Sequence, residues 1–211
     1  MTEPADIARS EDAAAARHRA KMAKRKAVQD AEVAAKTVLA KGLLMVHTGP
    51  GKGKSTAAFG LALRALGRGK RVGIVQFIKG AWETGERLAL ARFDDRLVWR
   101  TMGEGFTWET QDRARDERAA RAAWEASRAM LADASFDLVV LDELNVALRY
   151  DLIGLADVLA ALAARPPMQH AVVTGRNAKP ELVAAADLVT EMVAVKHHFA
   201  AGVRAQEGVE F

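Results

Sequence analysis

The chain has 211 residues, half of them hydrophobic, and carries a formal net charge of +4. This size suits one compact domain with an appendage rather than two domains. The sequence contains no cysteine, which excludes a disulfide framework and a thiolate metal site. It also lacks an apolar stretch long enough to span a bilayer or to form the core of a signal peptide. We therefore expect a cytoplasmic protein without a membrane partner.

The sequence predicts two parts: residues 1–41 form a helical appendage, and residues 42–211 form the main domain. A long polar helix is expected from about residue 10 to 41, with Ser10 as its N-cap. Its apolar stripe is thin and irregular, so the helix buries little by itself and should be mobile unless something binds against it. Its basic run is typical of a solvated face, or alternatively of a surface for an acidic substrate or a partner subunit. The run consists of Arg17, Arg19, Lys21, Lys24, Arg25 and Lys26.

Beyond this appendage, short apolar runs of strand length alternate with helical segments. Most runs lack a polar face, which is typical of parallel strands covered on both sides. The alternation predicts right-handed βαβ units, and ligands of such sheets bind at the carboxyl ends of the strands. Two of the intervening helices are expected at 110–133 and 152–164. The expected strands are 43–47, 71–78, 97–101, 137–142, 171–175 and 188–195.

A glycine-rich loop, TGPGKGKST, follows the first expected strand and opens the next helix. It ends like the phosphate-binding pattern G-x-x-x-x-G-K-[ST], although Thr48 stands where the first glycine is usual. Lys54 can neutralise phosphate charge, and the Ser55 hydroxyl can bind Mg²⁺. The alternative is a glycine-rich turn with a chance GKS. The expected nucleotide-binding residues are Gly49, Pro50, Gly51, Lys52, Gly53, Lys54, Ser55 and Thr56.

The loop and the strand pattern together predict an α/β fold. We expect an open, mostly parallel, RecA-like P-loop sheet of about six strands, with helices on both faces and a long N-terminal helix.

A second candidate site ends the apolar run FDLVVLDELN. Asp142 and Glu143 resemble a Walker B element, whose carboxylate meets the metal bound by the loop hydroxyl. In an ATPase, one acid would hold Mg²⁺ and the next would activate water. The alternative is that both acids only cap the following turn.

A third candidate site is the aromatic pair in MGEGFTWETQ. In an extended segment Phe106 and Trp108 would point the same way, and at the ligand end of a sheet they suggest a flat, mostly apolar partner. They could equally fill the core beneath the loop. Weaker signals at the same edge are Lys79 and Trp82, after the second strand, and Arg176, which could meet a phosphate or a carboxylate.

Taken together, these segments closely resemble the ATP:corrinoid adenosyltransferases of the P-loop type, over nearly the whole chain. A short loop with glycine, proline and lysine in this order is a feature of that family. The one small departure is Ser55, where threonine is common, and both residues offer a hydroxyl. The matching segments are the basic N-terminal helix, GPGKGKSTAAFG, QFIKG, MGEGFTWETQD, LDELN, TGRNAKPELVAAADLVTEM and KHHFAAGVRAQEGVEF.

The resemblance implies that the reduced cobalt of a corrinoid, Co(I), attacks C5′ of ATP and that triphosphate leaves. The loop and Lys54 would stabilise the departing chain electrostatically. Glu143, with or without Asp142, would hold Mg²⁺ or Mn²⁺ rather than activate water. Phe106 and Trp108 would occupy the lower face of the corrinoid, displace its axial ligand and so ease reduction of the cobalt. Further binding residues would be Lys79, Trp82 and Arg176.

The resemblance also implies a homodimer, a flavoprotein electron donor, and an N-terminal helix that covers its own or the neighbouring active site. Nucleic acid is not expected as a partner. The alternatives are a P-loop ATPase or kinase that releases ADP, a RecA-like nucleic-acid-binding protein, and a non-enzymatic corrinoid carrier. The sequence leaves open which corrinoid is the substrate, and whether adenosylcobalamin is made by biosynthesis or by salvage.

Overall fold

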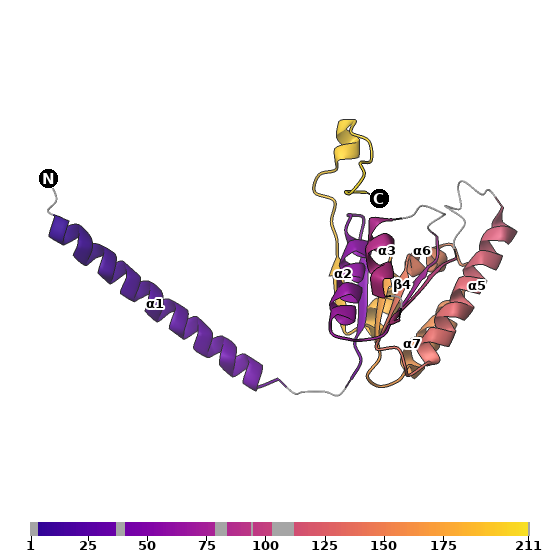
Figure 1. Cartoon of the computed structure of the whole chain (residues 1–211), viewed down its shortest axis with the longest axis horizontal. Coiled ribbons are helices and arrows are strands. Elements are labelled where there is room, and N and C mark those ends of the chain that lie inside the picture. Colours follow the sequence, from indigo (N-terminus) through magenta and orange to yellow (C-terminus); the bar gives the residue numbers. More distant parts are fainter. Residues whose placement is uncertain (1–3, 37–40, 79–83, 94, 103–111, 211) are drawn as a thin grey trace. The chain divides into compact units, whose positions relative to one another are not determined.

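The computed structural model describes residues 4–36, 41–78, 84–93, 95–102 and 112–210 (Figure 1). The chain divides into two compact units, Met1–Leu39 and Ala40–Phe211. Within the described residues, none of the helices combines the length and the apolar character needed to cross a membrane.

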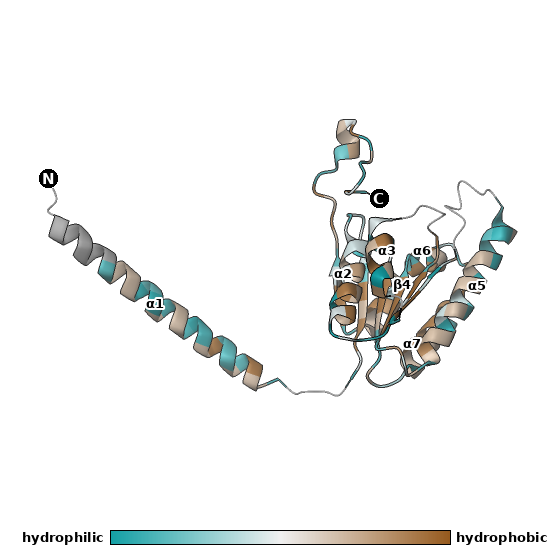
Figure 2. Cartoon of the chain, in the orientation of Figure 1, coloured by the Kyte–Doolittle hydropathy of each residue, from teal (hydrophilic) through white to brown (hydrophobic). Residues whose placement is uncertain are grey.

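The described residues of the first unit contain one helix, α1, which runs from Pro4 to Ala34. The predicted start was wrong, because the helix begins at a proline and Ser10 lies inside it. Proline suits the first turn of a helix, where its missing N–H would have no partner within the helix. Of the described side chains of α1 only that of Met22 is half-buried; Val28 is 53% exposed and Val33 66%. Figure 2 shows hydrophilic residues along much of the coloured part of this helix, and its described side chains are almost all exposed.

The second unit is built on a six-stranded sheet in the order β3-β2-β4-β5-β1-β6. All neighbouring pairs are parallel, which confirms the predicted open, parallel P-loop sheet. One strand, β5, lies between the strand that precedes the glycine loop and the strand that ends in Asp142. The strands are β1 (Leu44–Thr48), β2 (Val72–Gln76), β3 (Leu97–Thr101), β4 (Leu138–Asp142), β5 (His170–Thr174) and β6 (Leu188–Glu191).

Helices cover both faces of the sheet, as predicted. On one face α2 and α3 bury apolar residues against β2, β4 and β5, and on the other face α5, α6, α7 and α8 do so. Figure 1 shows α2 and α5 on opposite sides of the strands. The helices are α2 (Lys54–Gly67), α3 (Gly85–Leu90), α5 (Arg113–Ala132), α6 (Leu144–Arg149), α7 (Leu155–Ala164) and α8 (Pro180–Ala185), with 3₁₀ turns η1 (Ala91–Phe93) and η2 (His198–Ala201).

Strand β2 shows why the central strands read as continuous apolar runs. Val72 and Ile74 pack on the α2 side, whereas Val75 packs on the α5 side, so successive side chains enter different cores. Between them, Gly73 allows α5 to approach closely, because a Cβ there would lie 2.7 Å from the sulfur of Met130.

Strand β6 forms one edge of the sheet and differs from the central strands. All of its residues are exposed, and among the described strands it pairs only with β1. The predicted strand 188–195 is therefore too long, because β6 ends at Glu191. Its last residue pairs with Thr48, the point at which β1 itself ends and the glycine loop turns away.

Candidate active site

The glycine loop joins β1 to α2 at the carboxyl edge of the sheet. Gly49 and Gly53 have φ angles of 95° and 102°, a left-handed conformation that glycine adopts without steric cost. The Gly51 N–H donates to the carbonyl oxygen of Met192 at 2.6 Å. A Cβ added at Gly49 or Gly51 would lie 2.5 or 2.7 Å from that same oxygen. Residue 192, just beyond β6, therefore supports the loop from one side, a contact that the sequence did not reveal.

Lys54 begins α2 and is 94% buried, with a residual exposure of 6%. Its ammonium donates to the carbonyl oxygens of Gly49 at 3.0 Å and Gly51 at 2.5 Å. Burial lowers the pKa of Lys54 below the usual lysine value, and the nearby Glu143 carboxylate opposes this shift. The positive charge is thus held inside the loop by backbone carbonyls and lies within electrostatic reach of Glu143.

The first turn of α2 offers an anion site. Its N-cap is Gly53, so no side chain caps the first backbone N–H groups. Uncapped N–H groups and the positive end of the helix dipole favour a phosphate at this position. Ser55 is half-buried in this turn and Thr56 is exposed. The predicted phosphate loop and its lysine are therefore brought together at one helix N-terminus.

A row of buried polar side chains crosses the same edge of the sheet, at the ends of β2, β4 and β5. Gln76 is 3% exposed, and Asp142 and Thr174 are fully buried. The Asp142 carboxylate accepts hydrogen bonds from Gln76 Nε2 at 3.0 Å and from Thr174 Oγ1 at 2.7 Å. The two neutral donors compensate for the burial of the carboxylate. We call Gln76, Asp142 and Thr174 the polar row.

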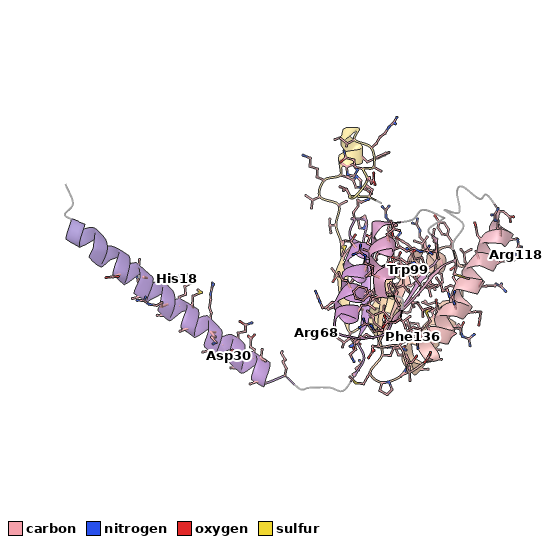
Figure 3. The ribbon with its side chains drawn as sticks, viewed as in Figure 1. His18, Asp30, Arg68, Trp99, Arg118 and Phe136 are labelled. Carbon is pink, nitrogen blue, oxygen red and sulfur yellow. The ribbon has the colours of Figure 1, made fainter. Side chains whose placement is uncertain are left out.

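Strand β3 extends these contacts on the other side of Gln76. Trp99 Nε1 and Thr101 Oγ1 donate to Gln76 Oε1 at 2.9 and 3.2 Å. The Trp99 ring also packs against that of Phe59, with centroids 5.0 Å apart, and Figure 3 shows it within the packed side chains of the second unit. The hydrogen bonds therefore connect four neighbouring strands.

Glu143 directly follows the polar row. It has φ 63° and ψ 21°, a left-handed conformation that is uncommon for a residue with a side chain. Its N–H donates to Thr174 Oγ1 at 2.9 Å. Its carboxylate lies over Gly175, where an added Cβ would be 3.1 Å from Glu143 Oε2. The two predicted acids therefore differ, since Asp142 is enclosed and Glu143 is only half-buried.

The remaining predicted binding residues lie near the loop or outside the described residues. Lys52 is exposed and forms an ion pair with Glu210, whose pKa it holds below the usual range. Arg176 is exposed after β5, and its charge contributes to the lowered pKa of Lys54. Outside the described residues lie Lys79, Trp82, Phe106 and Trp108.

Lys79 and Trp82 follow β2 in the chain, and Phe106 and Trp108 follow β3. The last residues of the two strands, Gln76 and Thr101, are paired in register. Both strands therefore end at the carboxyl edge on which the loop lies.

Side-chain clusters that could hold a metal by themselves are absent from the described residues, where no group of three or more His, Asp or Glu has suitable positions. Among the predicted site residues, the acids are Asp142 and Glu143. A cation here would therefore need further oxygen ligands, such as phosphate oxygens.

Comparison with known proteins identifies the family to which this chain is similar. The model of the family "ATP:corrinoid adenosyltransferase BtuR/CobO/CobP" matches residues 40–211, which include the loop, the polar row and Glu143. The chain belongs to the ATP:corrinoid adenosyltransferase family. A second family model, "Cob(I)alamin adenosyltransferase N terminal", matches residues 7–33, within α1.

Curated relatives agree with this membership. A corrinoid adenosyltransferase of Pseudomonas aeruginosa is 55% identical over 195 residues, which is 92% of this chain and 96% of the relative. One of Sinorhizobium is 52% identical, covering 93% of this chain and 92% of the relative. The corrinoid adenosyltransferase CobA of Salmonella typhimurium is 48% identical over 81% of this chain and 86% of its own length.

Among solved structures, the RadB recombinase matches at 18% identity with a TM-score of 0.46, over 74% of this chain and 77% of the other.

The predicted activity, adenosyl transfer from ATP to a corrinoid, is that of the adenosyltransferase family. Family membership thus favours the predicted enzyme over an ATPase, a nucleic-acid-binding protein or a corrinoid carrier.

Proposed function

We propose that the enzyme joins C5′ of ATP to the Co(I) centre of a corrinoid substrate and releases intact triphosphate. The electron pair of Co(I) forms the Co–C bond, the C5′–O bond breaks, and its electron pair leaves on the triphosphate oxygen. The observation that carries this proposal is a phosphate loop with a buried lysine in a chain of the adenosyltransferase family. Because Co(I) is itself a strong nucleophile, the reaction requires no side-chain base.

The loop would act on the leaving group. In most P-loop enzymes the bond that breaks is at the γ-phosphorus, where a nucleophile must be positioned. Here the reacting atom is a carbon at the other end of the triphosphate, so the loop need only hold the phosphates and stabilise charge on the departing chain. The uncapped N–H groups of α2 and the Lys54 ammonium are suited to this, with Lys52 and Arg176 as further cations.

The residues around Glu143 fit a hard divalent cation such as Mg²⁺, because they offer carboxylate and hydroxyl oxygens. We assign the side-chain contacts to Glu143 and Ser55. Both carboxylate oxygens of Asp142 already accept hydrogen bonds, from Gln76 and Thr174, so Asp142 would support the site from behind. When bound, Mg²⁺ neutralises charge on the triphosphate. The role of Glu143 would then be to hold a cation and not to activate water.

The corrinoid would bind beyond the ends of β2 and β3. The paired ends of these strands at Gln76 and Thr101 support this, because the segments with Lys79, Trp82, Phe106 and Trp108 both begin there. Phe106 and Trp108 would occupy the lower face of the corrinoid and favour four-coordinate cobalt. A flavoprotein would supply the electron, and the enzyme would act as a homodimer in which α1 covers an active site.

Product analysis tests the reaction. The full-length enzyme is incubated with ATP, Mg²⁺ and chemically reduced corrinoid, and phosphorus NMR follows the nucleotide. We expect triphosphate and a light-sensitive corrinoid product in equal amounts. Formation of ADP and inorganic phosphate in step with turnover would overturn the proposed bond cleavage. Comparing a,c-diamide, cobinamide and cobalamin substrates by kcat/KM would then separate biosynthesis from salvage.

A further inference from the structure

One hydroxyl group links the two acids of the site. Thr174 Oγ1 lies 2.7 Å from Asp142 Oδ1 and 2.9 Å from the Glu143 backbone nitrogen. We propose that Thr174 is a positioning residue for the Glu143 carboxylate, which it orients toward a divalent cation bound with ATP. This inference rests on the proposed metal contact of Glu143.

The chemistry of the partners fixes the direction of both hydrogen bonds. The Glu143 backbone N–H can only donate, so the Thr174 oxygen must accept from it. The hydroxyl proton is then free to point at Asp142 Oδ1, which can only accept when ionised. Thr174 therefore donates to one acid and accepts from the backbone of the next. A hydroxyl can do both because it carries one donor and two acceptor lone pairs.

The backbone of Glu143 needs such support. A residue with a side chain at φ 63° lies in a sparsely populated region, and it stays there only when its surroundings determine its conformation. The hydrogen bond from Glu143 N–H to Thr174 supplies one constraint. Asp142 supplies another, since it is fixed by Gln76 and Thr174 and directly precedes Glu143 in the chain.

The backbone after Thr174 completes the support. Gly175 has φ 124°, and its carbonyl oxygen accepts a hydrogen bond from Asn145 Nδ2 at 2.9 Å. A Cβ on Gly175 would lie 2.9 Å from Asn145 Cβ and 3.1 Å from Glu143 Oε2. The absence of a side chain at Gly175 thus leaves room for the Glu143 carboxylate. Residues 174 and 175 together determine the direction of this carboxylate.

The test measures cation binding directly. In full-length protein saturated with a non-transferable ATP analogue, Mn²⁺ binding is followed by electron paramagnetic resonance. Thr174→Val keeps the shape of the side chain but removes the hydroxyl. We expect its affinity for Mn²⁺ to fall about 10-fold, in the range found when an outer-sphere partner of a metal ligand is removed. Binding of the analogue without metal should stay within about 2-fold of the wild-type value, because the phosphate contacts of the loop remain.

Two further variants separate positioning from a general effect on the fold. Thr174→Ser retains the hydroxyl and should restore Mn²⁺ affinity to within about 3-fold of wild type, since both hydrogen bonds can form. Ser127→Ala is the matched control, because it removes another fully buried hydroxyl, which donates to Ala123 O within α5 at 2.7 Å. It should leave Mn²⁺ affinity unchanged. Equal losses in the serine and valine variants would overturn the proposal.

Glu143→Gln distinguishes this proposal from the proposed metal site. If Glu143→Gln keeps wild-type Mn²⁺ affinity, the assignment of Glu143 as a metal ligand fails. If Glu143→Gln weakens Mn²⁺ binding but Thr174→Val does not, only the role of Thr174 fails. In the Glu143→Gln background, Thr174→Val should cause little further loss. If the valine variant does not fold, Thr174→Ala, which leaves room for a water, is measured in the same way.

Discussion

Helix α1 and the carboxyl edge of the sheet are both expected to serve one reaction, yet they are built in opposite ways. At the sheet edge, Asp142 and Thr174 are fully buried and joined by hydrogen bonds across strands. In α1, all described side chains except that of Met22 are exposed. The sheet edge is therefore ordered by its own packing, whereas the described side chains of α1 form no apolar face that could order the helix by the hydrophobic effect alone.

This structural difference predicts that the sheet edge and α1 contribute to different steps of the reaction. Changes at the sheet edge should alter the chemical step or cation binding. Changes in α1 should alter substrate capture, because a helix of this kind gains order only when a ligand or a partner supplies the missing contacts. The Lys54 variant and the deletion of Met1–Leu39 test this division most directly.

The largest effect should come from Lys54. Lys54→Ala removes the cation that the loop carbonyls of Gly49 and Gly51 hold in place. We expect turnover with supplied Co(I) to fall about 100-fold or more, as for loss of a single oxyanion-stabilising donor. Steady-state rates at saturating corrinoid measure this. The control is Lys70→Ala, which removes an exposed lysine paired with Asp137 at 2.9 Å and should leave turnover unchanged; equal losses would contradict a specific role for Lys54.

The second largest effect should come from Trp108. If its ring keeps the cobalt four-coordinate, Trp108→Ala should lower turnover from Co(II) by about 10-fold or more, a loss of at least about 1.4 kcal/mol. Turnover from chemically supplied Co(I) should change much less. Parallel assays that start from Co(II) and from Co(I) corrinoid measure the ratio of the two turnover rates. Phe106→Ala is measured in the same way as a second variant. Equal losses in the two assays would remove this role from the aromatic pair.

A deletion of the first unit, Met1–Leu39, should have a smaller and different effect. The melting temperature of the remaining chain should stay within a few degrees, because the described side chains of α1 bury little surface. The KM for the corrinoid should rise several-fold while Mn²⁺ binding is retained. A milder variant, Val28→Gln with Val33→Gln, keeps the helix and changes only exposed valines. Unchanged kinetics in the deletion would exclude a covering role for α1.

The smallest effect should come from Asp187, which accepts from the Leu44 N–H at 2.8 Å and pairs with Lys41. These contacts hold the pKa of Asp187 below its ordinary value of 3.8. Their stabilisation is therefore present above about pH 3.8 and is lost as the pH falls through the lower folded-state pKa. Asp187→Asn should cost about 1 kcal/mol at pH 7, because an exposed pair is screened by solvent.

Urea unfolding at pH 7 and at pH 3 measures this last effect. The gap between wild type and Asp187→Asn should narrow at the lower pH, and turnover at pH 7 should stay unchanged. A gap that is independent of pH would show that the charge of Asp187 contributes nothing.

The strands could be predicted because a strand that is buried on both faces of the sheet consists mostly of apolar residues. Strand β6 was predicted too long because the apolar run continues to residue 195, whereas pairing stops where β1 turns into the loop at Thr48. The length of an edge strand is set by its neighbour and not by its own composition. The short helices α3, α6 and α8 were missed because six residues contain too little helical periodicity to recognise.

The sequence identified candidate site residues where a local motif contains them, and their roles stay predictions. Lys54, Ser55 and Glu143 belong to short patterns with a physical meaning. Gln76 and Thr174 were missed, because their bonds to Asp142 join positions 66 and 32 residues apart. A sequence signal for Gln76 and Thr174 was available, because each of three apolar runs ends in a polar residue. Parallel strands bring such ends to one edge of the sheet, so these residues could have been expected to lie together.

The support of the glycine loop by Met192 should determine how nucleotide binding responds to rising temperature. The carbonyl of Met192 follows an edge strand that is held on one side only, and edges open locally before the whole domain melts. Fraying of β6 would withdraw the backing of Gly49 and Gly51. Nucleotide affinity should therefore decline several degrees below the temperature at which the central strands lose their structure.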